Sequence, residues 1–168
     1  MPYGKSNYKI IRVTPAVIAG TTSVDDVMFD STEIPNAVIG NGGCSELIGI
    51  ALLDKDNEAH DLDIIFTQNQ RNLGTAGDAA DVSDSNFAAA KPIGAIDVDW
   101  SASKVSVGGL TSVCYFAGHN RSEKSMQLPM LLQASDDSTS IYFSAIAREE
   151  IAFAATDDLT FVFHIKYR

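Results

Sequence analysis

The chain has 168 residues, of which 45% are hydrophobic and 20% are charged, and its formal net charge is −10. This length fits one domain with a substantial core, and the composition excludes an intrinsically disordered protein. Because an acidic surface repels phosphate groups and anionic lipids, the charge argues against direct binding to nucleic acid or to a membrane.

Short apolar or alternating segments rich in Val, Ile, Phe, Tyr and Thr follow one another along the chain, separated by clusters of Gly, Asp, Asn and Ser. This pattern is typical of strands and turns. We predict strands at residues 8–13, 16–18, 27–29, 45–53, 62–67, 93–100, 111–117, 128–134, 141–147 and 159–167. Their spacing is too tight for βαβ units, which take about 30 residues each.

Helical periodicity is weak along the whole chain. The best candidate is residues 82–90, where Ser83 or Asp84 is expected to cap one or two helical turns. For residues 121–127 and 148–155, a short helix is an alternative to a loop.

Two polar loops are predicted to close β-hairpins, one in LLDKDNEAHDLDIIF and one, SDDSTS, in LLQASDDSTSIYF. Long hairpins, uneven strand spacing and a wide loop from 68 to 91 favour a sandwich over a closed barrel. The predicted fold is therefore all-β, a two-sheet, jelly-roll-like sandwich with at most one or two short helices. Residues 1–14 form an N-terminal arm or a first strand, and residues 15–168 form a single β-sandwich domain.

The two cysteines, Cys44 and Cys114, each lie inside an apolar stretch, and no CxxC or His-rich spacing accompanies them. A zinc site is therefore not expected. The favoured interpretation is two buried, reduced thiols, and a disulfide is the alternative. The N-terminus has no continuous apolar segment of a secretory signal, so we expect a protein that is made and used in a reducing cytoplasm, or assembled there.

The acidic run from Asp54 to Asp63 is the strongest candidate for a metal site. Counted from Asp54, an EF-hand loop needs Gly at its sixth position and Glu at its twelfth, but the chain has Ala59 and Ile65 there. A looser calcium site at Asp54, Asp56 and Asp61 remains an alternative to a solvated hairpin tip, which Asp and Asn favour.

Other residue types with catalytic chemistry lack the spacing that catalysis needs. Asp97 and Asp99 alternate with apolar residues, which favours the polar face of a strand over a glycosidase pair. His60, His119 and His164 show no HxH or HExxH spacing, and there is no GxSxG motif or phosphate-binding glycine loop. We therefore expect no catalytic, cofactor-binding or metal-binding residues, and no enzyme.

Three stretches carry a resemblance to known proteins: VDDVMFDSTEIPNAV, GGCSELIGIALLDKDNEAHDLDIIF and STSIYFSAIAREEIAFAATDDLTFVFHIKY. Together they resemble small virion structural proteins of tailed bacteriophages, the class that includes capsid decoration (cement) proteins. The resemblance covers most of the chain, and it rests on strand and turn patterns instead of catalytic motifs.

The resemblance implies a sandwich subunit, homotrimeric, seated on the outside of the capsid in the virion and assembled in the host cytoplasm. Its partners would be the major capsid protein and further copies of itself, with no nucleic acid, membrane or cofactor. The loop 68–91 and the segment 1–14 are candidates for these contacts. Lys5, Lys9 and Arg12 are the candidate contact residues, because they form a basic segment in an acidic protein.

Two other functions remain open. One is a tail or baseplate component with the same sandwich. The other is a carbohydrate-binding β-sandwich that uses Trp100, Tyr115 or Tyr142 as a stacking platform, with or without calcium at the acidic run.

Overall fold

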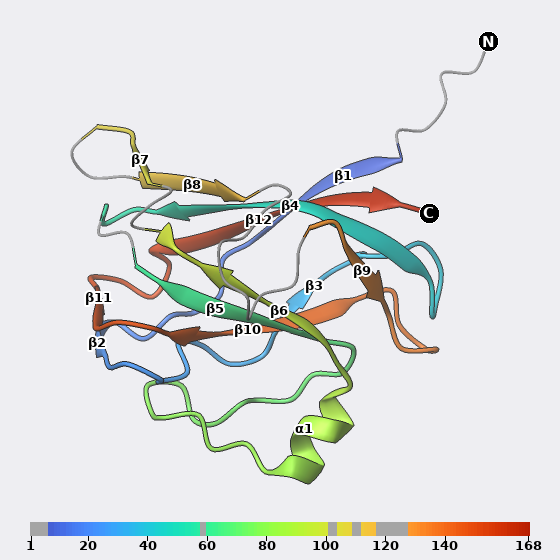
Figure 1. The fold of residues 1–168 in the computed structure, drawn as a ribbon, viewed down its shortest axis with the longest axis horizontal. Coiled ribbons are helices and arrows are strands. Elements are labelled where there is room, and N and C mark those ends of the chain that lie inside the picture. The colour runs from blue at the N-terminus through green and yellow to red at the C-terminus, as the bar shows by residue number, and fades with distance from the viewer. Residues whose placement is uncertain (1–6, 58–59, 101–103, 109–111, 117–127) are drawn as a thin grey trace.

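The computed structural model describes residues 7–57, 60–100, 104–108, 112–116 and 128–168, with only the backbone described for 113–116. Two antiparallel sheets lie face to face over this range, as the upper and lower layers of Figure 1. The β4 sheet contains β1 (Tyr8–Val13), β12 (Leu159–Tyr167), β4 (Cys44–Asp54), β9 (Met130–Gln133), β8 (Ser112–Phe116) and β7 (Val105–Ser106). The β10 sheet contains β3 (Thr32–Ile34), β10 (Ile141–Ala147), β5 (Leu62–Thr67) and β6 (Pro92–Val98), and a small third sheet pairs β2 (Gly20–Thr22) with β11 (Ile151–Phe153).

The strand order is that of a jelly roll. In one layer the order is β1-β12-β4-β9, because β9 pairs with the start of β4, while β8 pairs with its other end. In the facing layer the order is β3-β10-β5-β6. The chain crosses between the layers from β1 to β3, from β4 to β5 and from β10 to β12, as the two interlocked Greek keys of a jelly roll require. The predicted all-β, two-sheet, jelly-roll-like fold is confirmed.

Both predicted hairpins are wrong, although their strands exist. β4 belongs to one sheet and β5 to the other, and β9 and β10 are likewise in different sheets. The acidic run and the SDDSTS loop are therefore corners by which the chain passes from one layer to the other. Alternation of apolar residues indicates which side of a strand is buried, but it does not indicate which strand is its partner.

The core between the layers is built from alternate residues of the facing strands. On β12, Leu159, Phe161, Phe163 and Ile165 are buried, as their alternation predicts. Phe143 of β10 lies 5.0 Å from both Phe161 and Phe163 by ring centroids, with edge-to-face geometry. Phe29 joins the same cluster at 5.4 Å from Phe143. These rings therefore connect one sheet to the other.

Predicted and observed strands agree best where apolar residues alternate over six or more positions. Strands at 8–13, 62–67, 141–147 and 159–167 have the predicted bounds. The short strands β2, β3, β7 and β11 were not predicted. β11 also contradicts a helix at 148–155, no strand forms at 16–18, and residues 27–29 contribute only an isolated bridge at Val27. The suggestion of a helix at 121–127 falls outside the described residues.

Helix α1 (Asp84–Ala90) forms where the sequence predicts it. Ser83 is the N-cap, and its hydroxyl accepts a hydrogen bond from the Asn86 amide. Lys91 ends the helix in a left-handed conformation with φ of 52°. The cap therefore fixes where the long loop from 68 to 91 turns back to β6.

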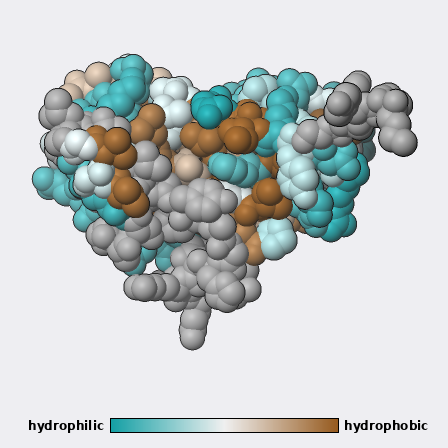
Figure 2. Space-filling view, turned by 90° about the horizontal axis from the view of Figure 1, so that it is seen from above, coloured by the Kyte–Doolittle hydropathy of each residue, from teal (hydrophilic) through white to brown (hydrophobic). Residues whose placement is uncertain are grey.

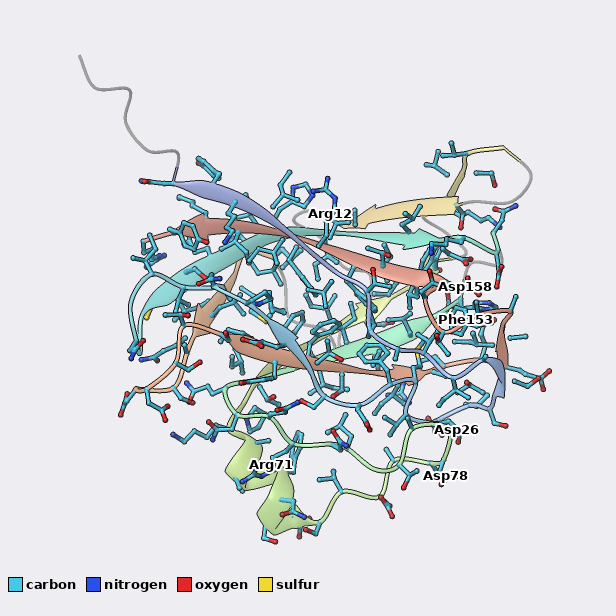
Figure 3. All side chains as sticks on the ribbon, turned by 180° about the vertical axis from the view of Figure 1, so that it is seen from behind. Arg12, Asp26, Arg71, Asp78, Phe153 and Asp158 are labelled. Atoms are coloured by element: carbon cyan, nitrogen blue, oxygen red, sulfur yellow. The ribbon has the colours of Figure 1, made fainter. Side chains whose placement is uncertain are left out.

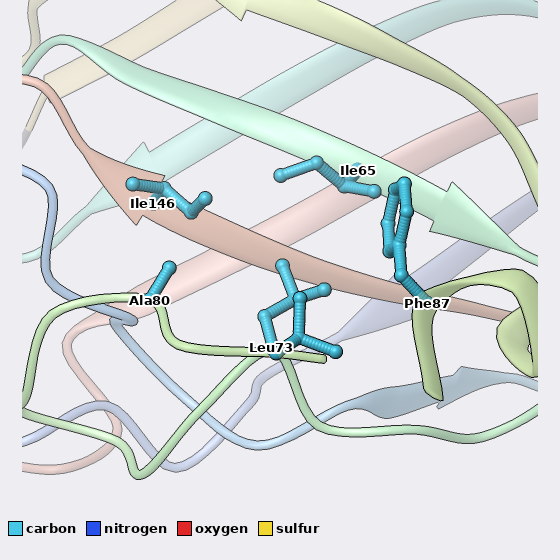
Figure 4. A pocket seen from close by; sticks show the side chains of 6 residues that line it. Ile65, Leu73, Ala80, Phe87 and Ile146 are labelled. Atoms are coloured by element: carbon cyan, nitrogen blue, oxygen red, sulfur yellow. The ribbon is translucent and has the colours of Figure 1, made fainter. Parts of the chain in front are cut away.

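That loop lies against the outer face of the β10 sheet (Figure 1). Its apolar side chains, including Leu73 and Phe87, pack toward Ile65 of β5 and Ile146 of β10, and they leave an apolar cavity of about 190 Å³ (Figure 4). Leu73 is buried. The loop is thus packed on the sheet through a few apolar side chains, while most of residues 72–81 remain exposed.

The register of β4 separates the two cysteines. Cys114 pairs with Leu52, eight positions along β4 from Cys44, which is about 27 Å in an extended strand. A disulfide needs Cα atoms within about 7 Å of each other. An intrachain disulfide, the alternative left open by the sequence, is therefore excluded, and Cys44 is a free, half-buried thiol.

Among the residues that the structure describes, no helix is both long and apolar enough to cross a membrane.

Candidate docking surface

Over the residues that the structure describes, the two layers of the sandwich differ in what covers them. The 68–91 loop packs over the β10 sheet, while the outer face of the β4 sheet carries large apolar side chains that remain exposed. Tyr8, Ile10, Val105 and Leu131 are 59%, 50%, 63% and 51% exposed. Figure 2 views this side of the molecule and shows hydrophobic side chains gathered among polar ones. We call this surface the open face.

Strand β1 contributes both apolar and basic side chains to the open face. Because Ile11 and Val13 turn toward the core, Tyr8, Ile10 and Arg12 turn outward. Arg12 pairs in register with Val162 of β12, and Ile10 pairs with His164. The outward side of β1 is therefore an alternation of aromatic, aliphatic and cationic groups at the edge of the sheet.

The predicted contact residues are placed as follows. Lys9 and Arg12 both lie on β1 and are exposed, and neither makes an ion pair with any residue that the structure describes. Lys5 lies outside the described residues. Residues 8–13 form a strand of the protein's own sheet, which was one of the two interpretations of this segment.

Two further cations near β1 are neutralised within the protein. Glu46 of β4 accepts contacts from Lys166, at 3.2 Å, and from Arg168. The hydrogen bonds donated by Arg168 and then by Lys166 hold the pKa of Glu46 below its usual range. Lys9 and Arg12 are therefore the cations on β1 whose charge is available to a partner.

Replacing Glu46 with glutamine is expected to lower the melting temperature slightly at pH 7, because two cations lose their counter-charge. Since the folded-state pKa of Glu46 is depressed, its stabilisation is present above the unfolded-state pKa and is lost as the pH falls through the folded-state value. In thermal melts the difference between wild type and Glu46→Gln should therefore begin to shrink as the pH falls below the ordinary glutamate pKa of about 4.3, and it should vanish only at lower pH, below the depressed folded-state pKa. Glu150→Gln, at an exposed position with no ion pair to any residue that the structure describes, is the control and should match wild type throughout.

The acidic corner between β4 and β5 has a structural role in this geometry. Asp54 Oδ1 accepts a hydrogen bond from the Asp56 amide, Asp56 Oδ2 from the Ala154 amide, and Asp61 Oδ1 from the Trp100 amide, each at 2.9 Å. The carboxylates thus hold separate backbone segments, and Asp54 is buried. Among the described residues, no three His, Cys, Asp or Glu side chains gather as a metal site, so this geometry gives no support to calcium at Asp54, Asp56 and Asp61.

The carboxylates on the β10 sheet also have local partners. Asp63 and Asp97 face each other across β5 and β6, and the Arg148 Nε donates to Asp63 Oδ2 at 2.7 Å. Arg148 also pairs with Asp25, which ties the loop before β3 to this sheet. Arg148 therefore links β5 to the segment before β3 through the carboxylates of Asp63 and Asp25.

The proposed aromatic platforms differ in accessibility. Trp100 is fully buried and cannot stack on a ligand, so that part of the carbohydrate hypothesis is wrong. The side chain of Tyr115 is outside what the structure describes. Tyr142 is half-buried on the outer side of β10 and lines a polar hollow that sequence reasoning did not find.

Comparison with known protein families and with curated proteins finds no match for this chain.

Proposed function

We propose that this protein is a capsid decoration protein of a tailed bacteriophage, which binds the outside of the assembled shell as a homotrimer and stabilises it. The observation that carries the proposal is the open face, where exposed apolar residues lie beside the available charge of Arg12, while Lys9 is exposed near the start of the same edge strand. The sequence resemblance and the jelly-roll strand order, which virion proteins commonly use, support the same assignment.

The chemistry of the open face suits a protein partner. The exposed apolar side chains of this face come from β1, β7 and β9, and exposed aromatic and aliphatic residues are typical anchors of protein interfaces. The net charge of −10 disfavours nucleic acid, while two cations on β1 favour an acidic patch on the major capsid protein. In this proposal the protein has no catalytic role.

Reversing the charge of both Lys9 and Arg12 to glutamate is expected to weaken binding to empty capsids of the same phage at least about tenfold, because two attractive contacts become repulsive. Cosedimentation of purified protein with capsids measures this affinity. Lys91→Glu, an exposed charge reversal at the end of α1, is the matched control and should bind as wild type does. Equal binding by the double variant would remove the open face from the proposal.

A tail or baseplate location is the main rival, and stoichiometry separates the two. Hundreds of copies in each virion support the shell, and a dozen or fewer support the tail. Quantitative mass spectrometry of purified virions gives this number.

A further inference from the structure

A second hollow lies on the β10 side of the molecule, where the start of the 68–91 loop meets the corner between β9 and β10. Its volume is about 430 Å³, within the range of roughly 300–1,000 Å³ that small-ligand sites occupy. Its lining is mainly polar and includes Arg71, Asp137 and Tyr142. This composition distinguishes it from the apolar cavity of Figure 4, which lies against the same sheet.

The walls of the hollow are held in place by hydrogen bonds within the protein. The Asn69 side-chain amide donates to the Ala89 carbonyl at 2.8 Å, and the Ser135 hydroxyl donates to Asn69 Oδ1 at 2.5 Å. The Gln70 amide donates to the Ser31 carbonyl at 2.9 Å. These bonds join segments that are far apart in the sequence, so the hollow is preformed.

Other groups in the hollow have hydrogen-bonding capacity that the protein does not use. Arg71 donates a hydrogen bond from Nη1 to the neighbouring Gln70 carbonyl, and it makes no ion pair with Asp137 or with any other described residue. Neither the Tyr142 hydroxyl nor the Asp137 carboxylate has a hydrogen-bond partner among the described residues. The hollow therefore brings together a guanidinium group, a carboxylate and a tyrosine side chain.

We infer that this hollow binds a neutral carbohydrate, with Tyr142 against the sugar ring and with Arg71 and Asp137 bonding its hydroxyl groups. A sugar has hydroxyls that both donate and accept, and it has an apolar ring face for an aromatic side chain, so it matches all three groups. An anion would fit Arg71 alone, because Asp137 and the net charge of −10 repel it. A purely apolar ligand would leave these polar groups without partners.

The hollow and the open face lie on different layers of the sandwich. In Figure 3, Arg12 lies on the β4 sheet and Arg71 lies beyond the β10 sheet, next to α1. A subunit seated on a shell through its open face would therefore keep the hollow accessible. The inference does not depend on the capsid assignment, and failure of either leaves the other standing.

The test begins with the full-length protein on an array of neutral, sialylated and sulfated glycans. Backbone amide NMR titrations with glucose, galactose, mannose, N-acetylglucosamine and inorganic phosphate at millimolar concentrations then locate the site. The expected result is binding to a neutral glycan, with shifts at residues 69–71 and 137–142. Tyr142→Ala should weaken this binding about tenfold or more, because the stacking surface is lost.

Three variants separate the site from general effects on the fold. Tyr142→Phe keeps the ring and should retain most of the affinity, while Asp137→Ala, at an exposed corner, should lose affinity without unfolding. Tyr8→Ala removes an exposed tyrosine on the other layer and should bind as wild type does. The inference is overturned by no binding to neutral glycans in either assay, by binding to anionic probes only, or by binding that survives both Tyr142→Ala and Asp137→Ala.

Discussion

Replacing Phe143 with alanine is expected to lower the free energy of unfolding by about 3–5 kcal/mol, the usual cost of removing a buried phenylalanine. Phe143 is fully buried, and its ring contacts Phe29, Phe161 and Phe163. Because Phe143 belongs to β10 while Phe161 and Phe163 belong to β12, the substitution opens a cavity between the two sheets. A loss of this size is a large part of the roughly 5–15 kcal/mol that stabilises a typical domain.

Urea unfolding followed by the fluorescence of Trp100, the single tryptophan and a buried one, measures this loss. Phe87→Ala is the matched control, because it makes the same chemical change at a residue of α1 that is 36% exposed. It should cost roughly 1 kcal/mol or less. If both variants lost the same stability, the aromatic cluster would not be what joins the layers.

The sequence predicts those parts of the fold that depend on residues close together in the chain, such as the alternation within a strand or the cap of a helix. β12 has the predicted bounds because four buried residues alternate with polar or smaller ones over its whole length. Helix α1 begins where Ser83 supplies a cap. By contrast, β2, β3 and β11 have three residues each, which is too short for a period of two to be visible.

The residues within a strand do not determine which strand it pairs with, and this explains why the two predicted hairpins are incorrect. A polar loop between two apolar strands suits a hairpin and a corner between sheets equally well. In this chain β4 is held by β12, β8 and β9, and β5 by β10 and β6, so tertiary pairing decides the outcome.

The two candidate sites also differ in whether the local sequence predicts them. The cations of β1 are visible in the sequence as a basic segment of an acidic chain. The exposure of Arg12 follows from strand alternation, whereas Lys9 is exposed although it has the same parity as the buried Ile11. The polar hollow is not visible, because Asn69 and Ser135 are 66 residues apart and meet only when the 68–91 loop folds across the β10 sheet.

The first strand gives the second large effect: deleting residues 1–13 is expected to prevent stable folding, while deleting residues 1–6 should leave stability unchanged. β1 pairs with β12 over six register positions, and its Ile11 is buried opposite Phe163. Losing Ile11 costs roughly 2 kcal/mol of apolar burial, and each lost ladder bond costs about 0.5–1.5 kcal/mol. The deletion would also leave β12 as an exposed edge, which favours aggregation.

The shorter deletion keeps every described contact of β1, including the bond from the Tyr167 amide to the Asn7 carbonyl at 2.7 Å. Circular dichroism melts of both truncated proteins measure the difference. A cooperative transition at the wild-type temperature after loss of residues 1–13 would mean that this segment is a dispensable arm.

The difference between the two deletions also decides which of them can be used to test capsid binding. Loss of binding after the longer deletion would follow from unfolding alone, whereas the shorter one removes Lys5 and leaves Lys9 and Arg12 on an intact sheet.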